Sequence, residues 1–98
     1  MSQNVHVAVR SHAGRRSELL EVIHTVAERA RAFPGCEGFE VYSGSDDPDL
    51  VIEWMKFTDR SDQEAFGASL AETGIMEQVM GLLAEAPQRT FLTAHPDV

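Results

Sequence analysis

The sequence predicts an α+β fold of the ferredoxin-like kind, in which a four-stranded antiparallel sheet carries helices on one face. Alternation of apolar and polar residues predicts strands near both ends and in the middle of the chain, and helical periodicity predicts helices between them. The resulting order is strand, helix, strand, strand, helix, strand, which is the βαββαβ plan. We expect one domain over residues 1–98, because a chain of 98 residues has room for only one hydrophobic core.

The first half of the chain is predicted to hold a strand, a helix and a hairpin. The first strand is indicated by the alternating Val5, Val7 and Val9. A helix follows over residues 15–32, and its apolar stripe consists of Leu19, Ile23, Val26 and Ala30. Pro34 ends this helix because it has no N–H, and Gly35 permits the reversal into a strand over residues 36–43. A polar turn and a third strand over residues 50–57 complete the hairpin.

The second half is predicted to hold a helical region in two parts and a last strand. The helix begins at Asp59 or Ser61, and Ser61 with Glu64 has the spacing of a capping box. It weakens at residues 73–74, and a further helical stretch runs from Ile75 to about residue 85. Pro87 stops that stretch, and the last strand is expected over residues 88–94.

Charge and cysteine content favour a cytoplasmic protein that binds neither nucleic acid nor anionic membranes. A formal net charge of -8 speaks against nucleic acid and anionic membranes as partners, since both need a basic surface. Cys36 is the only cysteine, so no internal disulfide can form and a reducing compartment is expected. We expect neither a membrane span nor a signal peptide, because no apolar run approaches about 20 residues and the first four residues lack a basic and apolar leader.

The predicted fold leaves one face of the sheet without helices. An exposed apolar sheet face is a large adhesive surface, and a second copy related by a two-fold axis would cover it, so we expect a homodimer through the sheet faces. On the third strand the helix-facing residues are taken to be Leu50, Ile52 and Trp54. Glu53 would then face the dimer interior, where Arg10 or His6 would pair with it.

Several segments together resemble a known family. They are Gly14 before the first helix, Phe33-Pro34-Gly35-Cys36 at the corner, Phe39-Glu40-Val41-Tyr42 in the next strand and Glu64-Ala65-Phe66 in the second helix. Over roughly residues 5–94 the chain resembles the antibiotic biosynthesis monooxygenase family. The resemblance implies a dimeric α/β barrel built from ferredoxin-like halves. It also implies one of several activities, because members include cofactor-free oxygenases of aromatic polyketides and quinols, haem-degrading enzymes and an isomerase.

Some positions depart from the family pattern. Phe66 stands where many members carry a histidine, which leaves open whether the chain is catalytic. The Asn, Trp and His of the haem-degrading members fall on Val7, Ser69 and Gln78, so haem degradation is not expected. Glu53 and Trp54 are adjacent where the family has Glu-x-Trp, and Phe57 takes the aromatic position.

The candidate site is an apolar pocket between the sheet and the helices. Its predicted lining consists of Val7, Phe57, Phe66, Met76 and Met80. The candidate catalytic residues are His24 as a proton acceptor, Trp54 as an N–H donor to a ligand oxygen, and Arg89 as a donor to a developing oxyanion. Structural roles remain the alternative for all of them, namely core packing for Trp54 and surface positions for His24 and Arg89.

Neither a metal ion nor an organic cofactor is expected. The four histidines are scattered and form no i, i+4 pair with another histidine or with the cysteine, so the ligand spacing of a zinc site is missing. No glycine-rich loop leads from a strand into a helix as in dinucleotide-binding proteins. Cys36 is expected to pack at the start of its strand rather than to act as a nucleophile.

The predicted function is that of a small cofactor-free monooxygenase acting on an aromatic polyketide or quinol-type substrate. A deprotonated phenol or anthrone can itself give an electron to O2, so the protein has to supply a dry pocket, a base and an oxyanion donor. Two alternatives stay open: an isomerase or cyclase that uses the same pocket, and a dimeric binding protein without catalysis. Consumption of O2 separates the first two functions, and ligand-induced thermal stabilisation without turnover indicates the third.

Overall fold

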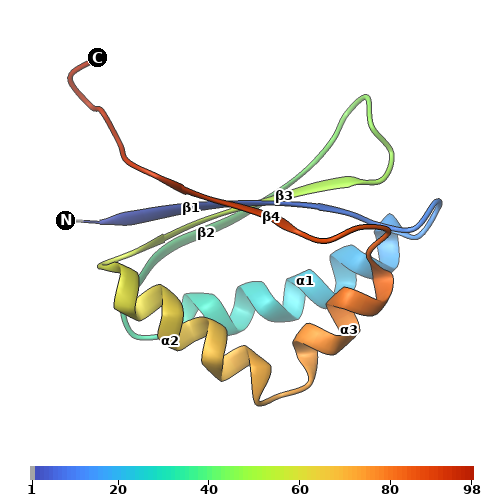
Figure 1. Ribbon diagram of the computed structural model, residues 1–98, viewed down its shortest axis with the longest axis horizontal. Helices are drawn as coiled ribbons and strands as arrows, with labels where there is room; N and C mark the ends of the chain where they lie inside the picture. Colours follow the sequence, from blue (N-terminus) through green and yellow to red (C-terminus); the bar gives the residue numbers. More distant parts are fainter. Residues whose placement is uncertain (1) are drawn as a thin grey trace.

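The computed structural model describes residues 2–98 and has one antiparallel sheet with helices on a single face (Figure 1). The elements in chain order are β1 (Gln3–Arg10), α1 (Arg16–Arg31), β2 (Cys36–Ser43), β3 (Leu50–Phe57), α2 (Arg60–Ala71), α3 (Ile75–Leu82) and β4 (Gln88–Leu92). The sheet order is β2-β3-β1-β4. The predicted βαββαβ arrangement is confirmed, and its second helical region is divided into α2 and α3 at Gly74, whose φ of 79° is left-handed.

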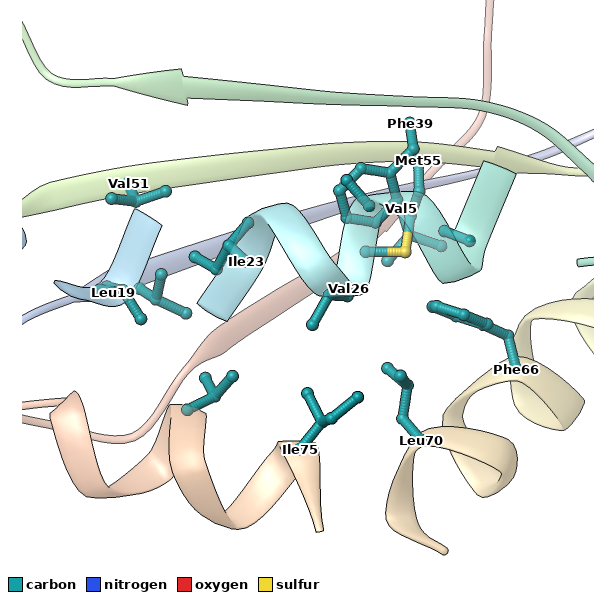
Figure 2. Close-up of a cluster of buried hydrophobic side chains, with 14 of the residues drawn as sticks. Val5, Leu19, Ile23, Val26, Phe39, Val51, Met55, Phe66, Leu70 and Ile75 are labelled. Carbon is teal, nitrogen blue, oxygen red and sulfur yellow. The ribbon is translucent and has the colours of Figure 1, made fainter. Parts of the chain in front are cut away.

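The core fills the space between the sheet and the three helices (Figure 2). The sheet contributes Val5, Val9, Phe39, Val51, Met55 and Phe57. The predicted stripe of α1 is buried in full, and α2 and α3 add Phe66, Leu70, Ile75 and Val79. These side chains leave water together, and burial of that apolar surface is the main force holding the helices against the sheet.

The corner at residues 33–36 joins three elements. Gly35 has a φ of 89°, and a Cβ at this position would stand 2.5 Å from Cγ of Asp62 in the first turn of α2. Its carbonyl oxygen accepts a hydrogen bond from the backbone N–H of Thr58 at 2.8 Å, which ties the corner to the end of β3. Cys36 is half-buried against the core, and burial raises the pKa of its thiol, as suits a packing residue.

The predicted capping box at Ser61 is wrong. Asp59 is the N-cap of α2: its backbone is extended, and its Oδ1 accepts a hydrogen bond from the backbone N–H of Asp62 at 3.0 Å. The Ser61 hydroxyl donates to the same carboxylate oxygen at 2.6 Å. A carboxylate at this position also interacts favourably with the positive end of the helix dipole, so Asp59 is the stronger of the two caps.

The predicted orientation of β3 is also wrong. Val51 and Phe57 are fully buried against the helices, and Glu53 and Met55 share their face. Ile52 and Trp54 therefore lie on the open face of the sheet, where the Trp54 ring comes within 3.2 Å of the position of a Cβ on Gly38. The prediction failed because both faces of β3 are largely apolar, so alternation alone does not indicate which face meets the helices.

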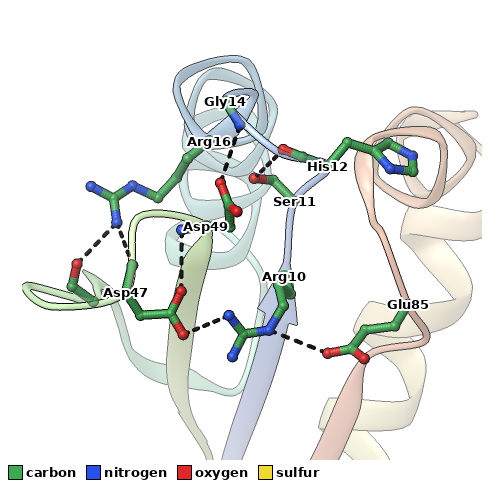
Figure 3. A network of polar contacts seen from close by, with 9 residues as sticks. Arg10, Ser11, His12, Gly14, Arg16, Asp47, Asp49 and Glu85 are labelled. Atoms are coloured by element: carbon green, nitrogen blue, oxygen red, sulfur yellow. Dashed lines mark hydrogen bonds and ion pairs between the residues drawn. The ribbon is translucent and has the colours of Figure 1, made fainter.

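Glu53 also lacks the ion pair predicted with Arg10 or His6, since it faces the helices. Arg10 instead pairs with Asp47 at 2.5 Å and with Glu85 at 3.3 Å (Figure 3). Arg16 donates to the carbonyl oxygens of Gly44 and Asp47, both at 3.0 Å. These contacts connect the turn between β2 and β3 to the end of β1 and the start of α1, and Arg10 extends them to the segment after α3.

Candidate active site

A cavity of about 380 Å³ lies between the inner face of the sheet and the helices. It is lined by Val7, Val9, Val26, Glu53, Met55, Gln63, Phe66, Gly67, Leu70, Met76, Val79, Pro87 and Arg89. Figure 2 shows Phe66 and Leu70 pointing from α2 toward Val26 of α1 and Met55 of β3. The volume lies in the range that accommodates a small organic ligand, and the lining is apolar except for three side chains.

The first polar side chain is Glu53, the one carboxylate in the lining. It lies on β3 directly opposite Val7 of β1, between the buried Val51 and Met55. Burial is the sole cause of a pKa raised from 4.5 to about 7, because no charged or hydrogen-bonding partner among residues 2–98 offsets the loss of water. At neutral pH the carboxyl is poised to accept a proton and to return it.

The second polar side chain is Gln63, which is 6% exposed in the first half of α2. Its Oε1 is the only buried side-chain nitrogen or oxygen among residues 2–98 that lacks a hydrogen-bond partner. Gln63 precedes Phe66 by three residues and Gly67 by four, so all three lie on the helix face that lines the cavity. The Gln63 side chain is therefore part of the cavity wall, and its Oε1 is buried within that wall.

The third polar side chain is Arg89 on β4. Val7 pairs with Glu53 on one side and with Arg89 on the other, so the carboxyl-bearing and the guanidinium-bearing residues flank it on the inner face of the sheet. Two strand spacings separate their backbones, which is about 10 Å. Arg89 is exposed, and its guanidinium lies 5.2 Å from the ring centroid of Phe91, which Arg60 covers at 3.7 Å. Arg89 thus places a cation at the open side of the cavity.

Four of the residues predicted for the site come together in this cavity: Val7, Phe66, Met76 and Arg89. Phe57 lies outside the lining, fully buried behind it with its ring 5.8 Å from that of Phe66. Met80 also lies outside, because α3 turns Ile75 and Val79 inward and leaves Met80 48% exposed.

The other two candidate catalytic residues lie away from the cavity. Trp54 is on the open face of the sheet. His24 is on the outer surface of α1, and its Nε2 lies 2.7 Å from a carboxylate oxygen of Glu28. Their catalytic roles thus stay predictions that the cavity geometry does not support, and Glu53 is the carboxyl that lines the cavity.

Sequence reasoning missed both Glu53 and Gln63 as members of the site. The signal for Glu53 was available in the positions of Val51 and Phe57, which share its side of the strand, but Leu50, Ile52 and Trp54 form an equally apolar face. Gln63 gave no signal beyond its helical spacing from Phe66.

The open face of the sheet carries a second, shallow hollow. It is lined by His6, Glu40, Tyr42, Ile52 and Trp54. The Tyr42 hydroxyl donates to a carboxylate oxygen of Glu40, and that hydrogen bond raises the pKa of the phenol. Tyr42 is 53% exposed, so a large aromatic side chain faces solvent on this surface.

Across residues 2–98, no three His, Cys, Asp or Glu side chains are grouped so that they could hold a metal ion. None of the helices in that range combines the length and the apolar character needed to cross a membrane.

Comparison with known proteins identifies the family. The sequence model of the family described as antibiotic biosynthesis monooxygenase matches residues 3–78, so the chain belongs to this family. No curated protein matches the sequence.

Solved structures share the fold at low sequence identity. A Nitrosomonas europaea protein that carries the same family name is 16% identical with a TM-score of 0.89, covering 98% of this chain and 92% of that one. Rv0793 from Mycobacterium tuberculosis is 18% identical with a TM-score of 0.87 over 99% of this chain and 98% of that one. SnoaB, a cofactor-independent oxygenase from Streptomyces nogalater, is 14% identical with a TM-score of 0.86 over 99% of this chain and 96% of that one.

Proposed function

We propose that this protein is a small cofactor-free monooxygenase that oxidises an aromatic polyketide or quinol-type substrate in the cavity between sheet and helices. The observation that carries the proposal is Glu53, a carboxyl with a pKa of about 7 in a cavity that is otherwise mostly apolar. Family membership supplies the class of reaction. SnoaB is a cofactor-independent oxygenase with a similar fold, which is consistent with the same chemistry here.

The proposed reaction begins with transfer of a proton from the substrate to Glu53. For a substrate whose reacting carbon is a CH2 group, as in an anthrone, deprotonation gives a carbanion stabilised by the aromatic rings. One electron passes from this anion to O2, and the resulting radical and superoxide combine to form a C–O bond. The product of this stage is a peroxide anion, and Glu53 then holds the proton that was removed.

The second stage returns that proton and removes another. Protonated Glu53 gives its proton to the peroxide, and the carboxylate then takes the remaining C–H proton while the O–O bond breaks. Hydroxide leaves and takes up this proton, so one CH2 group and one O2 become one carbonyl group and one water. The substrate supplies all the electrons, so the protein supplies only acid–base chemistry and a site.

Arg89 and the apolar lining supply the surroundings that this chemistry needs. The guanidinium lies across Val7 from Glu53 and could stabilise the negative charge that develops on an enolate or peroxide oxygen. Val9, Val26 and Leu70 exclude water from the cavity, which strengthens such interactions and protects the intermediates.

A second candidate function is isomerisation or cyclisation in the same cavity. The observation that favours it is again the near-neutral pKa of Glu53, because a group that accepts and returns a proton moves protons without O2 as well. The two functions differ in whether O2 is consumed. A third candidate function is that of a binding protein, which would bind the ligand without converting it.

We further propose that the open face of the sheet joins two copies of the chain. Tyr42, Ile52 and Trp54 place aromatic and aliphatic surface there without any helix to cover it. A two-fold axis through this face would bury the same patch from both copies, which is the usual solution for an exposed apolar sheet.

The test is O2 uptake by the purified protein with anthrone and with menadiol, in buffer containing EDTA and no added flavin or metal. With anthrone, the proposal expects one O2 consumed for each anthraquinone formed, at a rate proportional to protein concentration. Heat-denatured protein is the control for the spontaneous reaction. Substrate conversion without O2 uptake would favour the isomerase, and a thermal shift without conversion would favour a binding protein.

A further inference from the structure

The open face of the sheet, which carries no helix (Figure 1), has polar groups of different character on its two sides. Trp54 of β3 lies between Glu40 of β2 and His6 of β1, because each of the two pairs with it across the strands. All three side chains line the same shallow hollow. Adjacent strands lie about 4.8 Å apart, so a carboxylate-bearing and an imidazole-bearing residue stand at equal distances on either side of Trp54.

The two sides of this face also differ in the size of their side chains. In the next row, Ile52 of β3 lies between Tyr42 of β2 and Ala8 of β1. Tyr42 is 53% exposed, whereas Ala8 carries only a methyl group. The Trp54 ring adds bulk near β2, since it lies within 3.2 Å of the position of a Cβ on Gly38. The β2 side of the open face is therefore raised and acidic, and the β1 side is low and carries the imidazole.

A two-fold axis between two such faces can run parallel to the strands or across them. An axis parallel to the strands places β2 of one chain over β1 of the partner subunit, so the raised side meets the low side. The same axis brings Glu40 to the partner's His6. An axis across the strands places β2 over β2 of the partner subunit, so the two raised acidic sides collide and the two low sides leave a gap. Size and charge therefore both favour the axis that runs parallel to the strands.

We infer that the open face is a self-complementary docking surface for a second copy of this chain, in which Glu40 of each chain accepts a hydrogen bond from His6 of the partner subunit. Tyr42 then lies over the partner's Ala8. The inference rests on the proposed dimer and names the residue pairs that fix how the two copies dock. Each contact is made twice, because the two chains use the same surface.

The charges on the open face leave this pair available. Lys56 of β3 has Glu37 as its partner, and Arg10 of β1 has Asp47. The carboxylate and the imidazole that flank Trp54 take part in none of the ion pairs formed among residues 2–98. The carboxylate already accepts a hydrogen bond from the hydroxyl of the neighbouring tyrosine, and it has the capacity for a further donor.

The experiment exchanges the two charges and measures the Kd of the dimer by sedimentation equilibrium. Glu40→Arg alone places a cation opposite the partner's imidazole, and we expect it to raise Kd by at least about tenfold. His6→Glu alone places two carboxylates opposite each other and should have a similar effect. The double variant His6→Glu/Glu40→Arg restores opposite charges in both pairs, so its Kd should return to within about fivefold of the parent value.

Glu21→Arg is the matched control, because it changes the net charge by the same amount at an exposed position of α1, away from the open face. Its Kd should differ from that of the parent by less than about twofold. An equal loss in Glu21→Arg would overturn the inference, since the effect would then come from net charge. A double variant as weak as the single variants would also overturn it, because Glu40 would not face the partner's His6.

The outcome is separate from that of the proposed oxygenase, because association is measured without substrate. A dimeric parent whose double variant stays weak would remove the pairing and leave the proposed dimer in place. A parent that is monomeric at micromolar concentration would remove both.

Discussion

The two faces of the sheet differ in what they do to a polar group. Glu53 and Trp54 are neighbours in the chain, yet Glu53 lies in the apolar cavity and Trp54 on the open face. On the inner face the partly buried Glu53 has lost much of its hydration without gaining a partner, and its pKa rises to about 7. On the open face Glu40 has both solvent and the Tyr42 hydroxyl as partners. The same alternation thus separates the proposed catalytic cavity on one side of the sheet from the proposed dimer surface on the other.

The difference in role between the two faces is tested most directly by neutralising one carboxyl on each face. Glu53→Gln should lower kcat/KM for anthrone oxidation by about 100-fold or more, because it removes the proposed general base while keeping the shape of the side chain. Glu40→Gln on the open face should change the rate by less than about twofold. The measurement is initial O2 uptake. Equal losses in both variants would contradict the separation of roles.

Removal of an aromatic ring from the inner face should have the next largest effect. Phe57 is fully buried against Phe66, so Phe57→Ala should lower the free energy of unfolding by about 3 to 5 kcal/mol through lost burial and a cavity. Urea denaturation followed by circular dichroism measures the change. The loss should be the same at every protein concentration, because no second copy is needed to bury this ring.

The raised pKa of Glu53 predicts a dependence of stability on pH. Its pKa is about 7 in the folded state and near 4.5 when unfolded, so folding favours the protonated form. The contribution of Glu53 to stability is therefore full below about pH 4.5 and is lost as the pH rises through about 7. The loss is on the order of 3 to 4 kcal/mol, from a difference of about 2.5 pKa units at about 1.4 kcal/mol per unit.

The difference between the parent and Glu53→Gln isolates this contribution, because other groups titrate alike in both proteins. We expect the variant to gain stability relative to the parent between about pH 4.5 and 7.5. A difference that stays flat across that window would show that the carboxyl is not withdrawn from water in solution.

Shortening a side chain on the open face should weaken the proposed dimer rather than the folding of the single chain. Trp54→Ala should weaken the proposed dimer by about 2 kcal/mol, or roughly 30-fold in Kd, as buried interface aromatics typically do. Sedimentation equilibrium over a range of concentrations measures it. Phe57→Ala is the inner-face counterpart. A parent protein that is monomeric at micromolar concentration would remove the basis for this prediction.

The smallest effect is expected on the surface of α1. His24 is 71% exposed and beside Glu28, so His24→Ala should change anthrone oxidation by less than about twofold. A large loss of rate would instead support His24 as the proton acceptor and would transfer the catalytic role away from the cavity.

Much of the fold was predictable because its signals are local. The alternation at Val5, Val7 and Val9, the stripe of α1 and the break at Pro34 each depend on a few neighbouring residues. The cap of α2 was less certain, because Asp59 and Ser61 are both good N-cap residues and the exit of the chain from β3 decides between them.

The lining of the cavity was predictable where local periodicity indicated it. Phe66 and Met76 line the cavity from α2 and α3, and Val7 and Arg89 line it from β1 and β4. The position of Glu53 was not predictable in this way, because the direction in which β3 faces depends on long-range pairing with β1 and β2 and not on the strand's own pattern. The missing hydrogen-bond partner of the Gln63 Oε1 is a property of the folded structure alone, which the sequence pattern does not reveal.

The position of Trp54 over Gly38 has a practical consequence. It is the only tryptophan in the chain, so the intrinsic fluorescence of the protein at long excitation wavelengths comes from the open face of the sheet alone. A second copy covering that face would shift the indole emission to shorter wavelength, whereas a ligand entering on the far side of the sheet would leave it largely unchanged. Assembly can therefore be followed optically in the unlabelled protein and kept separate from ligand binding.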